Sequence, residues 1–405
     1  MSQLEFTPRT LPEGFQIPPA ATEIINNLLG PLADRQELLD IRGSDYVPHP
    51  KLEIVHAGYD AILQARDNRR INHQEFEAHL KDFVDDIPEG PQRDYAIQLF
   101  NMGLIMSRYA TGNPEDRQTA NDQFKNSFCY ENNIDANVPE SVFNSKVTDP
   151  SLQAMVITQM MRANRVLNNT ENQQLILALR WHLIPDRNYF KIRGLVGSLN
   201  HIALFKWQVT GELEESASIL QAAAELAKSA GDETWFEMLE NAGIVLGSLG
   251  RYGEAVLLLE QANIASRGDE RIDEESRLFS RGNLEVSRFG LFMQVGKQTS
   301  EYYDENLMQE FAYLLGDLSN NCSDYESLLS SVFEIELARL EVVKLLGDED
   351  LSREIQNKLL SLAVELMGDN SNEEYVQDEL LPFHHSAIKH LAEKVYLQAI
   401  ENLEK

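Results

Sequence analysis

The sequence predicts an all-α protein, a right-handed α-solenoid of stacked antiparallel helix hairpins. Three features of the 405 residues lead to this prediction. Apolar residues recur at steps of three and four along most of the chain after residue 50, which is the spacing of an amphipathic helix. Glycines stand where several of these stretches end, and no alternating run of useful length indicates a strand. The clearest hairpin covers residues 236–269.

The hairpin at residues 236–269 carries a contact stripe on each of its two helices. The first stripe consists of Leu239, Ala242, Gly243 and Leu246, and the second of Ala255, Leu259 and Ala262. Gly243 and Ala255 are small where the helices are expected to cross. Gly250 stands where a helix ends in a left-handed residue, and the ring of Tyr252 is expected to wedge between this hairpin and the next.

This pattern resembles a tetratricopeptide repeat. That repeat has a small residue late in its first helix, glycine and an aromatic residue at the turn, and Ala-x3-large-x2-Ala in its second helix. A second copy covers residues 197–230, and a degenerate copy lies near residues 95–127. The resemblance implies a stacked-hairpin architecture that acts by binding, and it does not identify the partner.

The chain is expected to divide into an arm and one solenoid. Residues 1–50 are punctuated by proline and form an N-terminal arm or cap, in which a helix at 21–39 should break at Pro31. The arm either packs along the first hairpins or is free. Residues 51–405 form the single solenoid, with a polar connector at about 128–150.

Several helix ends can be predicted from capping residues. Asn72 is expected to cap a helix, with Glu75 completing a capping box. A long helix is expected at residues 272–295, ending at Gly296. Another should start at Ser323 or Asp324 and stop at Gly347.

The charge of the chain restricts its partners. There are 65 acidic and 35 basic residues, a formal net charge of −30. Such a surface repels phosphate backbones and anionic lipids, so we expect no nucleic-acid and no membrane partner. The basic run at residues 66–70 precedes an acidic helix, which argues against a DNA reader. A basic peptide or protein is the expected partner, unless the charge serves only solubility.

The expected cellular compartment and the expected lack of catalytic chemistry are inferred from motifs that the sequence does not contain. The two cysteines, Cys129 and Cys322, give no disulfide framework and are interpreted as buried apolar residues. No secretory signal or apolar run of membrane-spanning length is present, so we expect a cytoplasmic protein. No catalytic motif is found, and we expect no cofactor, no metal and no enzymatic activity. His384, His385 and His390, with Glu393, are interpreted as solvated or capping residues rather than metal ligands.

The resemblance also implies where a partner would bind. In tetratricopeptide-repeat proteins, the first helices of successive hairpins line a concave groove. The matching positions here are Ser198, His201, Phe205, Gln208, Glu237, Glu240, Ile244, Ser248 and Asn283. Their two carboxylates, amides and apolar groups suit a peptide that carries a basic residue. The lysines and arginines that would capture a terminal carboxylate are missing from these positions. Alternatively, this face is only solvated or is filled by the chain's own arm.

Three functions are compatible with the sequence. The first is a non-enzymatic adaptor or scaffold that binds a protein or peptide in the groove. The second is a peptide-responsive sensor that changes its curvature or dimerisation, so a homodimer is possible. The third is a helical enzyme whose site carries no known motif.

Overall fold

The computed structural model describes most of the chain. The described residues are 10–42, 55–56, 58–59, 61–63, 72–109, 114–184, 188–267, 272, 274–299, 304–368, 370, 372–381 and 384–403. Within them every regular element is a helix, and consecutive helices pack on one another, which confirms an all-α, solenoid-like fold. None of these helices combines the length and the apolar character that crossing a membrane requires.

The chain folds into two compact units. Unit 1 consists of Met1–Ile202 and Glu225–Glu233, and unit 2 of Ala203–Ala224 and Thr234–Lys405. The single solenoid expected over residues 51–405 therefore remains a prediction, and each unit is described by itself.

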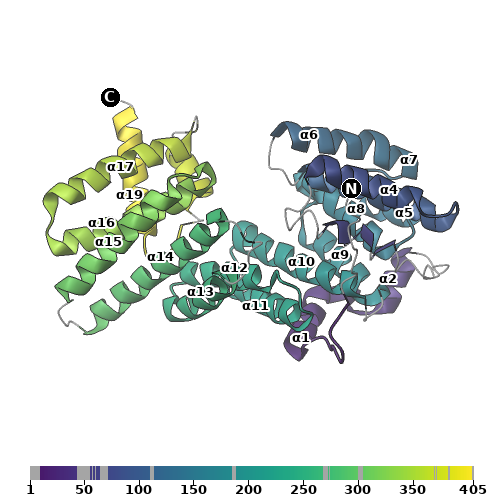
Figure 1. The fold of residues 1–405 in the computed structure, drawn as a ribbon, viewed down its shortest axis with the longest axis horizontal. Coiled ribbons are helices and arrows are strands. Elements are labelled where there is room, and N and C mark those ends of the chain that lie inside the picture. Colours follow the sequence, from purple (N-terminus) through teal and green to yellow (C-terminus); the bar gives the residue numbers. More distant parts are fainter. Residues whose placement is uncertain are drawn as a thin grey trace. The chain divides into compact units, whose positions relative to one another are not determined.

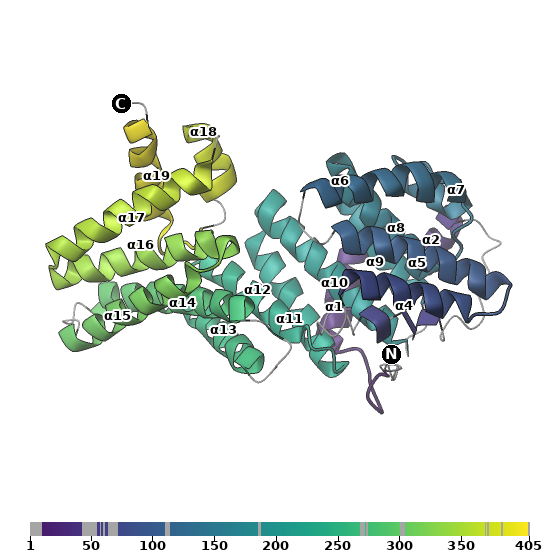
Figure 2. The same ribbon diagram turned by 45° about the horizontal axis from the view of Figure 1, so that its top comes forward.

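Unit 1 is built from short helices. These are α1 (Pro19–Leu29), α2 (Arg35–Arg42), α4 (His73–Asp85), α5 (Pro91–Tyr109), α6 (Pro114–Gln123), α7 (Tyr130–Asn132), α8 (Pro150–Ala163), α9 (Thr170–Leu183) and the part of α10 (Tyr189–Phe205) up to Ile202. Helices α4, α5 and α6 lie side by side, and α8 packs on both α5 and α9 (Figures 1 and 2). The capping box of Asn72 and Glu75 at the start of α4 is present as predicted.

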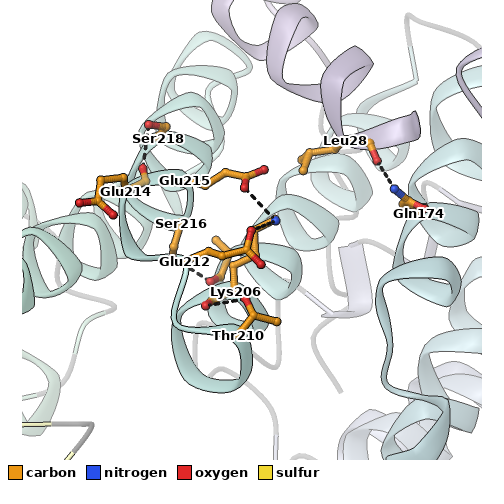
Figure 3. Close-up of polar contacts among 10 residues, drawn as sticks. Leu28, Gln174, Lys206, Thr210, Glu212, Glu214, Glu215, Ser216 and Ser218 are labelled. Atoms are coloured by element: carbon orange, nitrogen blue, oxygen red, sulfur yellow. Dashed lines mark hydrogen bonds and ion pairs between the residues drawn. The ribbon is translucent and has the colours of Figure 1, made fainter. Parts of the chain in front are cut away.

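The described part of the N-terminal arm packs on unit 1. Its helix breaks close to Pro31, as expected, since α1 ends at Leu29 and a 3-10 turn at Gly30–Ala33 separates it from α2. Ile25 and Leu29 of α1 are fully buried. The side-chain amide of Gln174 on α9 donates to the carbonyl of Leu28 at 2.8 Å (Figure 3). The arm therefore lies against α9 instead of along the first hairpins.

The segment at residues 128–150 is more than a polar connector. A π-helix at Phe124–Cys129 continues into α7, and a 3-10 helix follows at Pro139–Asn144. Phe128, Val142 and Val147 are each at most 2% exposed. These apolar side chains anchor the segment to unit 1 by burying their surface.

Unit 2 contains the longer helices. These are the first part of α11 (Leu213–Ser229), then α12 (Trp235–Ser248), α13 (Tyr252–Arg267), α14 (Glu274–Thr299), α15 (Glu305–Cys322), α16 (Leu329–Leu346), α17 (Glu349–Met367), α18 (Glu373–Tyr375) and α19 (Lys389–Leu403). Each helix from α12 to α16 packs on the next one along the chain, and α17 packs on both α16 and α19.

The α12–α13 hairpin matches its prediction in detail. Gly250 ends the turn with a φ of 76°, in the left-handed region. The ring of Tyr252 stacks on His385 with centroids 5.2 Å apart. A β-carbon placed on Gly290 of α14 would lie 2.7 Å from that ring. Tyr252 is thus packed between its own hairpin and the next helix, as the sequence indicated.

Two predicted helix ends in unit 2 are wrong. Helix α14 runs through Gly296 to Thr299, because one interior glycine costs a helix only about 1 kcal/mol. Helix α16 starts at Leu329, after a 3-10 turn at Glu326–Leu328, and not at Ser323 or Asp324. The stop at Gly347 is confirmed by its φ of 76°.

Candidate functional site

Unit 1 has a partly open cavity of about 300 Å³ between α5, α8, α9 and α10. Its basic lining residues are Arg162, Arg180, Arg193 and His201, and its hydroxyl groups come from Ser107, Ser151 and Thr158. The apolar lining includes Tyr59, Met106, Met155 and Phe190. Among the described residues that line it, none is acidic. In a chain of net charge −30, this is a concentration of positive charge.

Three helices bring the basic residues together. Arg162 lies in the last turn of α8 and Arg180 in the last turn of α9. Arg193, Gly197 and His201 follow one another at steps of four on α10, so they share one face of that helix. This spacing of four residues is the one feature of the sequence from which part of the cavity lining could have been predicted.

Arg180 is held in place by two hydrogen bonds. Its Nη1 donates to the carbonyl of Gly194 at 2.7 Å and to the hydroxyl of Ser198. Burial, and then the nearby charge of Arg162, lower the pKa of Arg180 to about 10. Both partners are neutral groups, so these bonds orient the guanidinium without neutralising it.

Arg162 also has no acidic partner among the residues that the structure describes. Its guanidinium carbon lies 5.5 Å from the ring centroid of Tyr109. Burial lowers its pKa, which measures the cost of removing a cation from water. Buried cations in proteins are normally paired with an anion. Arg162 and Arg180 are both half-buried, and neither has such a partner among the described residues.

Ser151 and His201 complete the polar wall. Ser151 is 3% exposed, and its hydroxyl has no hydrogen-bond partner in the described part of the protein. The surrounding protein, and then Arg162 and Arg180, lower the pKa of His201 to about 4. The ring keeps exposed surface because it lines the cavity, and it is neutral at pH 7.

The predicted groove residues are distributed over both units. Ser198 and His201 belong to unit 1, and the remaining seven to unit 2. Ser198 was wrongly assigned to an open groove, because it is 3% exposed and accepts a hydrogen bond from Arg180. His201 lines the cavity instead. In unit 2, Gln208 and Glu237 are exposed, whereas Phe205, Glu240, Ile244, Ser248 and Asn283 are half-buried.

Local contacts satisfy some of the polar groups in this region of unit 2. Lys206 reaches Glu212 at 2.7 Å and Glu215 at 2.9 Å (Figure 3). The hydrogen bond from Lys206 lowers the pKa of Glu212 to about 2. The half-buried carboxyl group of Glu240 forms a hydrogen bond with Ser280, while its Oε1 has no partner in the described structure. Burial raises the pKa of Glu240 to about 7.

The histidines near residue 385 are not all solvated, so that interpretation was wrong. His384 and His385 are buried in unit 2. Nδ1 of His384 lies 2.9 Å from the carboxylate of Glu334, and Nε2 of His385 lies 3.1 Å from the hydroxyl of Ser287. Only His390 is exposed. In the described part of the chain, no group of histidine, cysteine and acidic residues has the arrangement of a metal site.

The prediction for the two cysteines has a clear outcome. Cys129 and Cys322 are free and buried as expected, and burial raises their pKa values to about 12 and about 11. The basic run at residues 66–70 lies outside the described residues.

Comparison with known proteins does not assign this chain to a family. No protein-family model matches this chain, and no curated protein matches it significantly. The resemblance to tetratricopeptide repeats therefore stays a hypothesis. The chain is an all-α protein of sequentially packed helices, and its unit 1 contains a positively charged cavity.

Proposed function

We propose that this chain is a non-enzymatic binding protein, of the helical-repeat kind, whose ligand or partner places an anionic group in the cavity of unit 1. The observation that supports this proposal is the pair Arg162 and Arg180, which line one cavity without a carboxylate partner among the described residues. The expected basic partner is replaced here by an acidic one, because local charge at the site outweighs net charge at a distance.

The energetics favour an anion at this site. Both guanidinium groups are half-buried without a carboxylate partner among the described residues, and an oxyanion would accept charge-assisted hydrogen bonds from both. The ligand would then stabilise the folded state, by about 2.7 kcal/mol at a concentration of 100 times its Kd.

Sulfate is a suitable probe, with thermal unfolding as the measurement. We expect sulfate to raise the Tm of the wild-type chain at constant ionic strength, and we expect Arg162→Gln to remove this effect. The matched control is Arg165→Gln, which alters the net charge equally at an exposed position three residues away. The proposal is wrong if all three proteins respond to sulfate identically.

A second candidate function is supported by Glu240 in unit 2. Its half-buried carboxyl group, which forms a hydrogen bond with Ser280, lies one turn after the exposed Glu237, and this pair of acidic side chains suits the ammonium group of a basic peptide. Tri-lysine should bind the wild-type chain more tightly than Glu240→Gln does. The control is Glu310→Gln, which removes an exposed carboxylate elsewhere in unit 2. Equal affinity of these variants would exclude a role for Glu240.

A further inference from the structure

We infer that the ligand of the unit 1 cavity is a small molecule with an oxyanion headgroup and an apolar body, such as an aryl or short acyl carboxylate or phosphate ester. This inference rests on the proposed function and specifies the ligand's chemistry. Three properties of the cavity lead to it: its volume, its polar end and its apolar wall.

The volume sets the size of the ligand. The cavity has a volume of about 300 Å³. It lies at the lower end of the range of about 300–1,000 Å³ for small-molecule sites. A ring with one short substituent fits this space, whereas a helix or a nucleic-acid strand does not.

The polar end has more hydrogen-bond donors than the protein itself satisfies. Arg180 is oriented through Nη1, and its other guanidinium nitrogens have no acceptor among the described residues. No acceptor in the described structure contacts the guanidinium of Arg162, and the hydroxyl of Ser151 is equally unpartnered. Planar guanidinium groups bind carboxylate and phosphate oxygens in pairs. One oxyanion would satisfy donors from α8 and α9 at once.

The apolar wall explains why a bare inorganic ion would fill the cavity poorly. Tyr59 and Phe190 meet edge to face with centroids 6.3 Å apart. His56 stacks on Phe190 at 4.8 Å, which fixes the orientation of that ring. Met106 and Met155 add flexible, polarisable surface that adapts to an irregular apolar group. Burying an aryl or acyl body here removes apolar area from water.

Isothermal titration calorimetry with pairs of compounds separates the headgroup from the body. The pairs are acetate with phenylacetate, and inorganic phosphate with phenyl phosphate. We expect the aryl member of at least one pair to bind at least tenfold more tightly than its inorganic or methyl counterpart. The stronger pair identifies the headgroup as carboxylate or phosphate. Benzylamine, which has the body but a positive charge, should not bind.

A substitution at Gly197 tests the contribution of the ligand's apolar body. Gly197 lines the cavity, and a β-carbon there would meet no heavy atom within 4 Å. Gly197→Leu should reduce the aryl advantage to below threefold, because its side chain would occupy the space of the aryl body. The control is Gly253→Leu, at a glycine on α13 whose β-carbon would also meet nothing within 4 Å. Ser151→Ala is a second variant that leaves the backbone intact, and it should weaken the aryl anion by about tenfold.

The outcomes distinguish this inference from the proposed function. If inorganic anions bind through Arg162 and the aryl group adds nothing, the inference is overturned and the proposed function stands. If no anion binds, both fail. If benzylamine binds as tightly as phenylacetate, the cavity recognises an aromatic body without a headgroup, and the inference is also overturned.

Discussion

Gly243 of α12 faces the side chain of Leu259 on α13 so closely that no side chain fits between them. A β-carbon on Gly243 would lie 2.6 Å from Cγ of Leu259 and 3.3 Å from the carbonyl oxygen of Ala255. Gly243→Ala should therefore destabilise the chain by about 1–3 kcal/mol, since the methyl group separates the helices. Chemical denaturation measures this loss as a lower midpoint.

Gly253, on the same hairpin, is the control for Gly243. It lies in the first turn of α13, and a β-carbon there would meet nothing within 4 Å. Gly253→Ala should leave stability unchanged or raise it by up to about 1 kcal/mol, because alanine is the better helix former. If both variants lost the same stability, the close approach at Gly243 would have no energetic consequence.

The sequence predicted this hairpin because its signals are local. Gly243 and Gly250 each have a role that follows from neighbours within one helix pair, so spacing alone was sufficient to assign them. Tyr252 also contacts His385 and Gly290 outside the hairpin, and its position was inferred from the repeat pattern. The capping box of Asn72 and Glu75 is a local signal too. Local signals failed where a helix tolerates a residue that usually ends it. Gly296 was predicted to end α14, but the helix continues to Thr299.

The cavity could not be predicted in this way. Arg162 and Arg180 lie on different helices, and only the packing of α8, α9 and α10 brings them to one recess. His201 was predicted to line a groove with residues of unit 2, whereas it lines the cavity of unit 1. Likewise, the burial of His384 depends on Glu334, fifty residues away. Contacts of this range leave no periodic signal in a single sequence.

Glu240→Gln should stabilise the chain above neutral pH. Burial raises the pKa of Glu240 from its ordinary value to about 7, so the folded state binds a proton more tightly than the unfolded state. This carboxyl group thus favours folding below about pH 4.5, and the benefit is lost as the pH rises to 7. At pH 8 the variant should be more stable by on the order of 1–3 kcal/mol. Denaturant unfolding at pH 8 and pH 4 measures the difference, which should vanish at pH 4.

His385 should give the opposite pH dependence. Burial lowers its pKa to about 4, although Glu334 acts to raise it, so the unfolded state binds the proton more tightly. Stability from this group is complete above about pH 6.5 and is lost as the pH falls to 4, by up to about 3 kcal/mol.

His385→Gln isolates this effect from other titrating groups. The variant loses the contact with Ser287 and should be less stable at pH 7, but the loss should shrink as the pH falls to 4. Exposed His390→Gln is the control and should follow the wild-type curve. Parallel curves for wild type and His385→Gln would contradict the assignment.

Anion binding in unit 1 should be coupled to proton uptake by His201. Without a ligand, the surrounding protein and the charges of Arg162 and Arg180 hold the pKa of His201 at about 4. An anion in the cavity offsets those charges and raises this pKa, because opposite charge favours the imidazolium form. The affinity must then increase as the pH falls from 7 towards 4, and level off once the free ring is also protonated.

Sulfate keeps its charge across this range, so its affinity reports on the protein alone. We expect sulfate to bind severalfold more tightly at pH 5 than at pH 7.5. Calorimetry in buffers of different ionisation enthalpy should detect fractional proton uptake at pH 5. In His201→Asn, both the pH dependence and the proton uptake should disappear while binding at pH 7.5 persists, because the neutral ring contributes no charge there. If the sulfate affinity of the wild type does not change with pH, the protonation of His201 is not coupled to anion binding. If His201→Asn loses all binding, the ring has a structural role in the cavity.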